Sequence, residues 1–109
     1  MTNTPIYQLK AEFFKTLGHP ARIRVLEVLR EGERSVSDLV PDVGLEASHL
    51  SQQLAVLRRS NLVKTRRLGT SVVYSVSTPM VFELLDVART ILMSSLVDTR
   101  TLLEELEES

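Results

Sequence analysis

The sequence predicts a mainly α-helical fold with one β-hairpin, in the order α-α-(β)-α-α-β-β-α. Leu50, Leu54 and Leu57 recur at the spacing of one face of a helix. After residue 61 the apolar period changes to two, with β-branched residues on both sides of a Gly69-Thr70 turn. A helix followed directly by such a hairpin is the arrangement of a winged helix-turn-helix, in which the hairpin is the wing.

Two amphipathic helices are expected before residue 31. The first runs from about Pro5 to Leu17, where an apolar residue returns every three or four positions. Gly18-His19 interrupts it, and Pro20 suits the first position of the second helix, where a missing N–H costs nothing. We expect His19 to be a helix cap or a structural hydrogen-bonding group, and Arg22 to face solvent.

A short strand and a short helix precede the leucine-bearing helix. Ser35-Val36 is the expected strand, and Ser37 suits the N-cap of the helix that follows it. Pro41 would then lie in the first turn of that helix, where proline is tolerated. Gly44 suits a left-handed C-cap, after which we expect a helix over Ala47–Arg59. We call the helix over Ala47–Arg59 the recognition helix.

The final helix is long and begins after Thr78-Pro79, which reads as an N-cap and a first-turn proline. Its apolar residues continue to Leu106, and we expect the acidic end to fray over 102–109. A single domain spanning residues 1–109 is too small to bury both this helix and the first one. Their leftover apolar faces predict a homodimer in which the first and last helices of two subunits pack together.

Charge is divided unevenly along the chain. The 109 residues hold 13 Lys and Arg against 14 Asp and Glu, a net charge of -1, which by itself suggests no nucleic-acid partner. From residue 83 onward seven acids stand against two bases, a local charge of -5, whereas no acid occurs between residues 47 and 82. One surface can therefore approach phosphates while the rest repels the duplex. The basic residues of the acid-free stretch are Arg58, Arg59, Lys64, Arg66 and Arg67.

Composition excludes several classes of function. Without Cys, the chain has no disulfide, thiolate metal site or cysteine nucleophile. Its two histidines lie 30 positions apart, and there is no glycine-rich phosphate loop, so we find no nucleophile and base to propose and expect no enzyme. No apolar run is long enough for a secretory signal or a membrane span, which predicts a cytoplasmic protein without a membrane partner.

Four segments resemble the ArsR/SmtB family of dimeric bacterial repressors. They are FKTLGHPARIRVLEVL at 14–29, SVSDLVPDVGL at 35–45, SHLSQQLAVLRRSNLV at 48–63 and RRLGTSVVYSV at 66–76. They span most of the chain, in family order and with family spacing. The resemblance implies a homodimeric, sequence-specific transcriptional regulator, a repressor of the ArsR type, that binds double-stranded DNA at a palindromic operator.

In this family the recognition helix enters the major groove. Gln can pair bidentately with adenine, and Ser or His can bond base acceptors or phosphate. By resemblance, the wing arginines contact phosphate or the minor groove, and Thr70 stands where relatives often carry a further Arg. The DNA-binding residues expected on this basis are Ser48, His49, Ser51, Gln52, Gln53, Arg59, Arg66 and Arg67.

The metal sites of the family are not carried over by the resemblance. The thiolate pair that many relatives place in the short helix corresponds to Ser35 and Ser37, and hydroxyls do not replace soft thiolates. A second family site uses His and carboxylates of the paired last helices. Here the last helix has no His, and its carboxylates suit hard cations only weakly. We therefore expect no metal and no cofactor.

Two questions stay open from the sequence. The DNA-binding activity is controlled either by an unknown small-molecule effector at the dimer interface or by the concentration of the protein itself. The alternative function is a winged-helix protein-interaction module that recruits a protein partner through its dimer helices. Only in that alternative would replacing Arg66 and Arg67 leave the activity intact.

Overall fold

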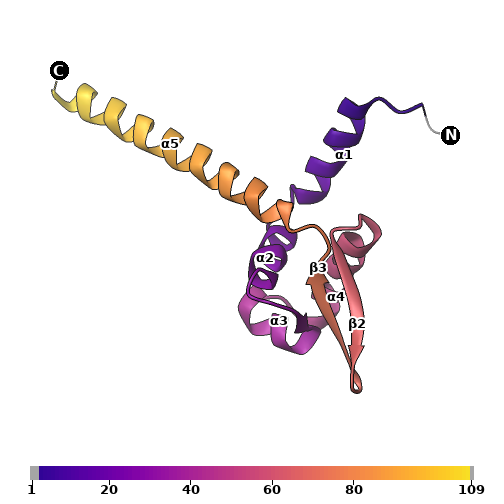
Figure 1. Cartoon of the computed structure of the whole chain (residues 1–109). Helices are drawn as coiled ribbons and strands as arrows, with labels where there is room; N and C mark the ends of the chain where they lie inside the picture. Colours follow the sequence, from indigo (N-terminus) through magenta and orange to yellow (C-terminus); the bar gives the residue numbers. More distant parts are fainter. Residues whose placement is uncertain (1–2, 109) are drawn as a thin grey trace. The chain divides into compact units, whose positions relative to one another are not determined.

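The structure is a computed structural model that describes residues 3–108, and the elements follow the predicted order (Figure 1). The described residues form two compact units, which divide between residues 78 and 79. Within residues 3–108, no helix combines the length and apolar character that a bilayer span requires. The first unit contains α1 (Ile6–Leu17), α2 (Pro20–Leu29), β1 (Arg34–Ser35), α3 (Val36–Val43), α4 (Ala47–Arg59), β2 (Val63–Leu68) and β3 (Ser71–Val76), and the second contains α5 (Met80–Glu108).

The core of the first unit lies where α2, α3 and α4 contact one another. The predicted apolar face of the recognition helix, α4, is confirmed, because Leu50, Leu54 and Leu57 are completely buried. Leu26 of α2 and Leu39 of α3 are buried to the same degree. Burying each such side chain stabilises the folded state by about 1.5–3 kcal/mol relative to leaving it exposed. This packing fixes which side of α4 faces inward and leaves the opposite side to solvent.

Capping residues set where α2 and α3 begin. The Nδ1 atom of His19 accepts a hydrogen bond from the backbone N–H of Ala21 at 3.1 Å, which confirms His19 as a cap. The prediction of Ser37 as the cap of α3 is wrong, because the Ser35 hydroxyl accepts from the Asp38 N–H at 3.3 Å. The helix therefore begins earlier, and Pro41 lies in its interior instead of its first turn.

The wing is the hairpin formed by β2 and β3, residues 63–76, which extends from the helices (Figure 1). The sheet is antiparallel with strand order β1-β3-β2. Leu68 pairs with Ser71, so Gly69 and Thr70 form the two-residue turn that the sequence predicts. Gly69 has a φ of 65°, the left-handed value that such turns need and glycine supplies. Gly44 at the end of α3 has a φ of 80°, which confirms its predicted left-handed C-cap.

α1 and α5 both leave large apolar side chains exposed. In α1, Leu17 is buried, whereas Ile6, Tyr7 and Phe14 are more than half exposed. α5 has 29 residues and is helical through 102–108, where the sequence predicts fraying; that fraying in solution stays a prediction, and residue 109 lies outside the described residues. The large apolar residues exposed on α5 are Met80, Val87, Ile91, Leu92, Met93, Leu96, Val97, Leu102, Leu103 and Leu106.

Candidate nucleic-acid interface

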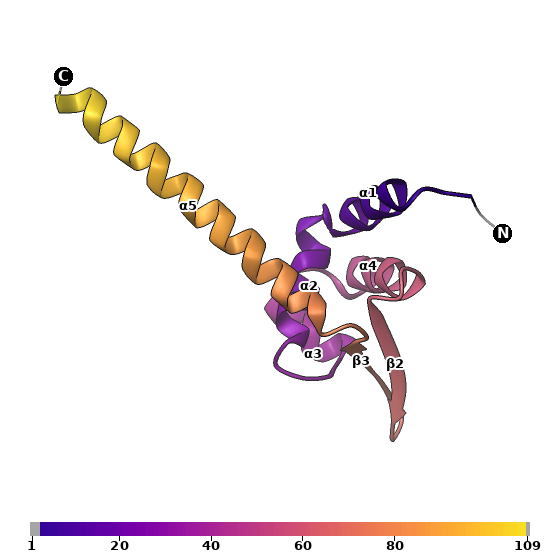
Figure 2. The ribbon, with the colours of Figure 1, turned by 45° about the horizontal axis from the view of Figure 1, so that its top comes forward.

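The solvent side of α4 carries most of the predicted DNA-binding residues. Ser48, His49, Ser51 and Gln52 are exposed along its first half, and Arg59 is exposed at its last position. Ser48, Gln52 and Arg59 share one face because they are separated by four and seven residues. Figure 2 shows α4 beside the base of β2, which it contacts. Hydrogen-bonding groups are thus presented next to the wing.

Gln53 does not belong to this exposed set. The sequence places it among the DNA-reading residues, but its side chain is only 8% exposed. Its Oε1 atom accepts a hydrogen bond from the Nε of Arg22 at 2.8 Å. The amide oxygen is therefore engaged inside the protein, and the direct base contact predicted for Gln53 does not fit its position in this structure.

The helical period could have identified the inward position of Gln53. It follows Leu50 by three residues and precedes Leu57 by four, so it lies within the stripe of buried leucines. The motif of the resembling family groups it with Gln52, although adjacent helical residues point about 100° apart. The period is the better guide here because packing of the leucines fixes the rotation of α4.

Arg22 differs from its predicted position in the same way. We expected it to face solvent, but its guanidinium is partly buried between helices. Besides its bond to Gln53, its Nη1 donates to the backbone carbonyl of Thr16 at 3.1 Å. That carbonyl lies in the last turn of α1, where helix carbonyls have no partner in their own helix. One guanidinium therefore joins α1 to α4.

Arg66 of the wing forms a two-point ion pair with Glu33, the residue before β1. Its Nε donates to Glu33 Oε2 at 2.8 Å, and its Nη2 donates to Oε1. These hydrogen bonds, aided by the charge of Arg66, lower the pKa of the Glu33 carboxyl below its ordinary value. The same pairing raises the pKa of Arg66. The sequence gives no local sign of this pair, because Glu33 lies outside the acid-free stretch.

The other basic residues near the recognition helix are not neutralised. Within the described part of the chain, no ion pair involves Arg58, Arg59, Lys64 or Arg67. All four are exposed. Arg67 adjoins Arg66 in β2, so the two side chains leave opposite faces of the strand. The positive charge available to a phosphate is therefore carried by these four residues more than by Arg66.

Ser35 and Ser37 lie at the positions of the thiolate pair of the resembling family. Their hydroxyl oxygens are 3.1 Å apart and share a hydrogen bond. In residues 3–108 there is no group of three or more His, Cys, Asp or Glu side chains arranged to hold a metal ion. The Ser35 hydroxyl instead caps α3, and the Ser37 hydroxyl bonds to that of Ser35.

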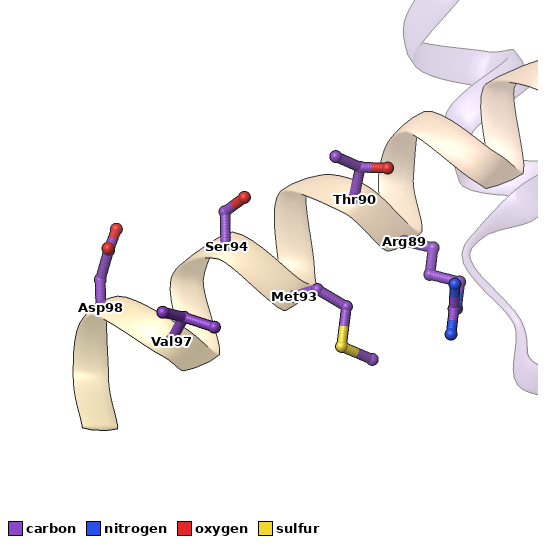
Figure 3. A pocket seen from close by; sticks show the side chains of 6 residues that line it. All are labelled: Arg89, Thr90, Met93, Ser94, Val97 and Asp98. Atoms are coloured by element: carbon purple, nitrogen blue, oxygen red, sulfur yellow. The ribbon is translucent and has the colours of Figure 1, made fainter. Parts of the chain in front are cut away.

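A shallow hollow of about 400 Å³ lies along α5 (Figure 3). All of its lining residues come from this one helix, so it is open on the side away from the helix. Such a surface does not enclose a small molecule, and an effector for this protein stays a prediction. The lining residues are Arg89, Thr90, Met93, Ser94, Val97 and Asp98.

Residues 19–65 match the family model described as bacterial regulatory protein, arsR family. Over 107 residues the chain is 56% identical to Rv0081 of Mycobacterium tuberculosis, an uncharacterized HTH-type transcriptional regulator. That match covers 97% of this chain and 94% of Rv0081. The crystal structure of Rv0081 superposes with a TM-score of 0.80 at 58% identity, covering 88% of this chain and 97% of the other.

Two further proteins are also similar to this chain. A biofilm growth-associated repressor of Xylella fastidiosa is 40% identical over 81 residues, which are 74% of this chain and 71% of the repressor. The fragment 1–100 of Mb0332 from Mycobacterium bovis, described as a homodimeric winged helix-turn-helix DNA-binding domain, has a TM-score of 0.74 at 25% identity. It covers 88% of this chain and 94% of the fragment. The fold predicted from the sequence is thus confirmed.

Proposed function

We propose that this chain, which belongs to the ArsR family of bacterial regulatory proteins, represses transcription by binding a palindromic DNA operator as a homodimer. The family membership confirms the resemblance found in the sequence. The matched family and relatives are transcriptional regulators, so the chain is a regulator and not an enzyme. Operator binding, the homodimer and the residues that contact DNA are the proposal.

The exposed polar face of α4 is the observation that carries the proposal. A B-DNA major groove admits an α-helix and presents base edges to its side chains. Gln52 supplies an amide that can pair with adenine, while Ser48, His49 and Ser51 supply bonds to bases or phosphates. Arg59, at the end of the same face, is positioned for the DNA backbone. Gln53 is assigned no direct contact because its amide oxygen is already bonded.

In this proposal the wing contributes positive charge that binds phosphates, and the recognition helix reads the base sequence. Arg67 is exposed and has no ion pair among the described residues, so it is the wing residue best suited to a phosphate. Arg66 is held by its ion pair with Glu33, the residue before β1, and contacts DNA less strongly. Thr70 follows Gly69 in the turn, where it offers a hydroxyl and no positive charge.

A homodimer accounts for the exposed apolar residues of α1 and α5. Large apolar patches on a soluble protein commonly mark an interface, and a two-fold interface uses the same surface of each copy. The related Mb0332 fragment is described as homodimeric. Two recognition helices related by such an axis would enter major grooves about one helical turn apart, which is why we propose a palindromic operator.

Residues 1–109 act as one winged helix-turn-helix domain with α1 and α5 as its dimer elements. The protein works in the cytoplasm, where bacterial DNA is found, without a metal or cofactor. Its activity is set either by an unknown small molecule at the dimer interface or by its own concentration.

Titration against DNA tests the proposal. Labelled duplexes covering the region upstream of its own gene and its neighbours are compared with random duplex of the same length at moderate salt. We expect the best site to bind about a thousandfold or more tightly than random DNA, as specific regulators do. Affinity for the best site that barely exceeds the affinity for random duplex would refute sequence-specific regulation.

A further inference from the structure

We propose that Arg22 is a positioning residue that ties the recognition helix to α1 through Gln53 and sets the orientation in which α4 meets DNA. This inference rests on the proposed function, since it takes α4 to be the element that reads DNA. It concerns residues that face away from the DNA and that the predicted binding set does not explain.

The geometry of the link uses the forked shape of a guanidinium. Arg22 lies in the first turn of α2, with Nε on the Gln53 amide oxygen at 2.8 Å and Nη1 on the Thr16 carbonyl at 3.1 Å. Because the donors of arginine are held in one plane, both acceptors are fixed relative to each other. The last turn of α1 and the middle of α4 are therefore held to one spacing by a single side chain.

Stability of the core does not require a glutamine at position 53, because an apolar side chain could fill the same place. Its neighbours in the buried stripe, Leu50, Leu54 and Leu57, are all apolar and completely buried. Replacing such an amide by leucine would bury more apolar surface and remove the cost of desolvating a polar group. A buried polar pair that gives no clear gain in stability is best known for fixing the alignment of helices.

The alignment of α4 matters because its reading residues alternate with its buried ones. Gln52 directly precedes Gln53, and rotation of the helix by one residue would turn every side chain by about 100°. α1, at the other end of the link, bears part of the apolar surface that we propose a second subunit covers. The link therefore relates the reading face of each subunit to one of its dimer elements.

Three variants separate positioning from folding. Arg22→Met and Gln53→Leu each break the link and leave the other partner unpaired, so both stability and alignment fall. The double variant Arg22→Met with Gln53→Leu leaves no unpaired group, so it regains stability but not the link. Arg24→Met is the matched control: it removes the same charge from the same helix, but Arg24 is exposed and, among residues 3–108, its Nε bonds to the carbonyl of Asp42 in α3 and not to α1 or α4.

The experiment compares two duplexes for every variant, with thermal unfolding measured in parallel. One duplex is the tightest sequence that the wild type selects from a randomised pool, and the other is random DNA of the same length. We expect both single variants and the double variant to lose about tenfold in preference for the selected duplex. The affinity of every variant for random duplex should stay within about twofold of the wild-type affinity. The variants that replace Arg22 lose one positive charge, and Arg24→Met, which loses the same charge, shows how much that loss alone changes the affinity and its salt dependence.

The outcomes distinguish this inference from the proposed function. A wild type that does not prefer any selected duplex overturns the proposed function and the inference together. A wild type with a clear preference that the double variant retains overturns only the inference, because stability without the link would then suffice. Arg22→Lys guards against a folding failure: it keeps the charge, but its flexible ammonium lacks the fixed fork that holds the two acceptors at one spacing, so the preference should fall in a folded protein.

Discussion

Two adjacent arginines of the wing differ at the scale of single residues. Arg66 is held by both oxygens of Glu33, whereas Arg67 has no ion pair among the described residues. A cation that is already paired gains less from a phosphate, because its carboxylate partner must be displaced or remains as a nearby negative charge. The two residues are therefore expected to contribute unequally to DNA binding although they are identical in type.

Alanine substitution of each arginine tests that difference. Arg67→Ala should weaken binding to all sequences alike and reduce the slope of log affinity against log salt by about one. Arg66→Ala, the matched control, should reduce the slope by less. Equal effects of the two would show that the Glu33 pair does not restrict Arg66. If the double variant binds DNA like the wild type, the wing has no role in DNA binding and the protein-interaction alternative gains support.

The Glu33 pair also predicts a pH dependence. Its folded-state pKa is lowered, so the pair stabilises the folded protein above the ordinary glutamate pKa of about 4.3 and loses this contribution as the pH falls through the lowered value. The effect should be small and salt-sensitive because both groups are exposed. Thermal unfolding of wild type and Glu33→Gln should differ at pH 6 to 8 and converge on acidification. A difference that widens in acid would contradict the assignment.

Single-residue features were predicted where the helical period decides them and missed where a distant partner does. The exposure of Ser48 and Gln52 follows from the buried leucines opposite them. The environments of Arg22 and Arg66 depend on Gln53 and Glu33, which lie 31 and 33 positions away in the sequence. A local sequence pattern does not contain these two pairings, because the partners come together only when the chain folds.

At the scale of elements, the predictions were best where one signal dominates. The bounds of α4, Ala47–Arg59, match the prediction because Gly44 ends the preceding helix and the leucine stripe defines the next. The hairpin turn was likewise located by Gly69. The start of α3 is harder to predict, because Ser35 and Ser37 are both suitable caps and their local chemistry does not decide between them.

The fixed rotation of α4 depends on its buried leucines. Leu54→Ala should lower the free energy of unfolding by about 2–5 kcal/mol, since a completely buried leucine leaves a cavity that its neighbours only partly fill. Urea unfolding measures this change. Ser48→Ala, on the exposed side of the same helix, should stay within about 0.5 kcal/mol of wild type. Comparable losses for both variants would contradict the assigned faces of α4.

At the scale of the whole molecule, exposed apolar surface is the reason to expect a second subunit. Leu92 and Leu103 of α5 are 62% and 56% exposed. Scattered apolar residues on a surface need no explanation, but α5 exposes them along most of its length. The sequence predicts this surplus from the length of the final helix, although it contains no information on how two copies would meet.

Charged substitutions on α5 test the dimer. Leu92→Asp with Leu103→Asp should give a monomer in sedimentation equilibrium, because burying two carboxylates in an apolar interface is unfavourable. Operator affinity should fall with the loss of the second recognition helix. Glu107→Gln, an exposed change on the same helix, serves as the control and should leave the dimer intact. A double variant that still sediments as a dimer would show that these residues lie outside the interface.

Selection of binding sites from randomised duplex, by the wild type and by Gln52→Ala, measures whether the exposed face of α4 reads DNA. The wild type should enrich a two-fold symmetric motif with half-sites about one helical turn apart. Gln52→Ala should relax one symmetry-related pair of positions by about 1–3 kcal/mol and leave the rest of the motif unchanged. No enriched motif for the wild type, or an identical motif for the variant, would contradict the claim that the exposed face of α4 reads DNA.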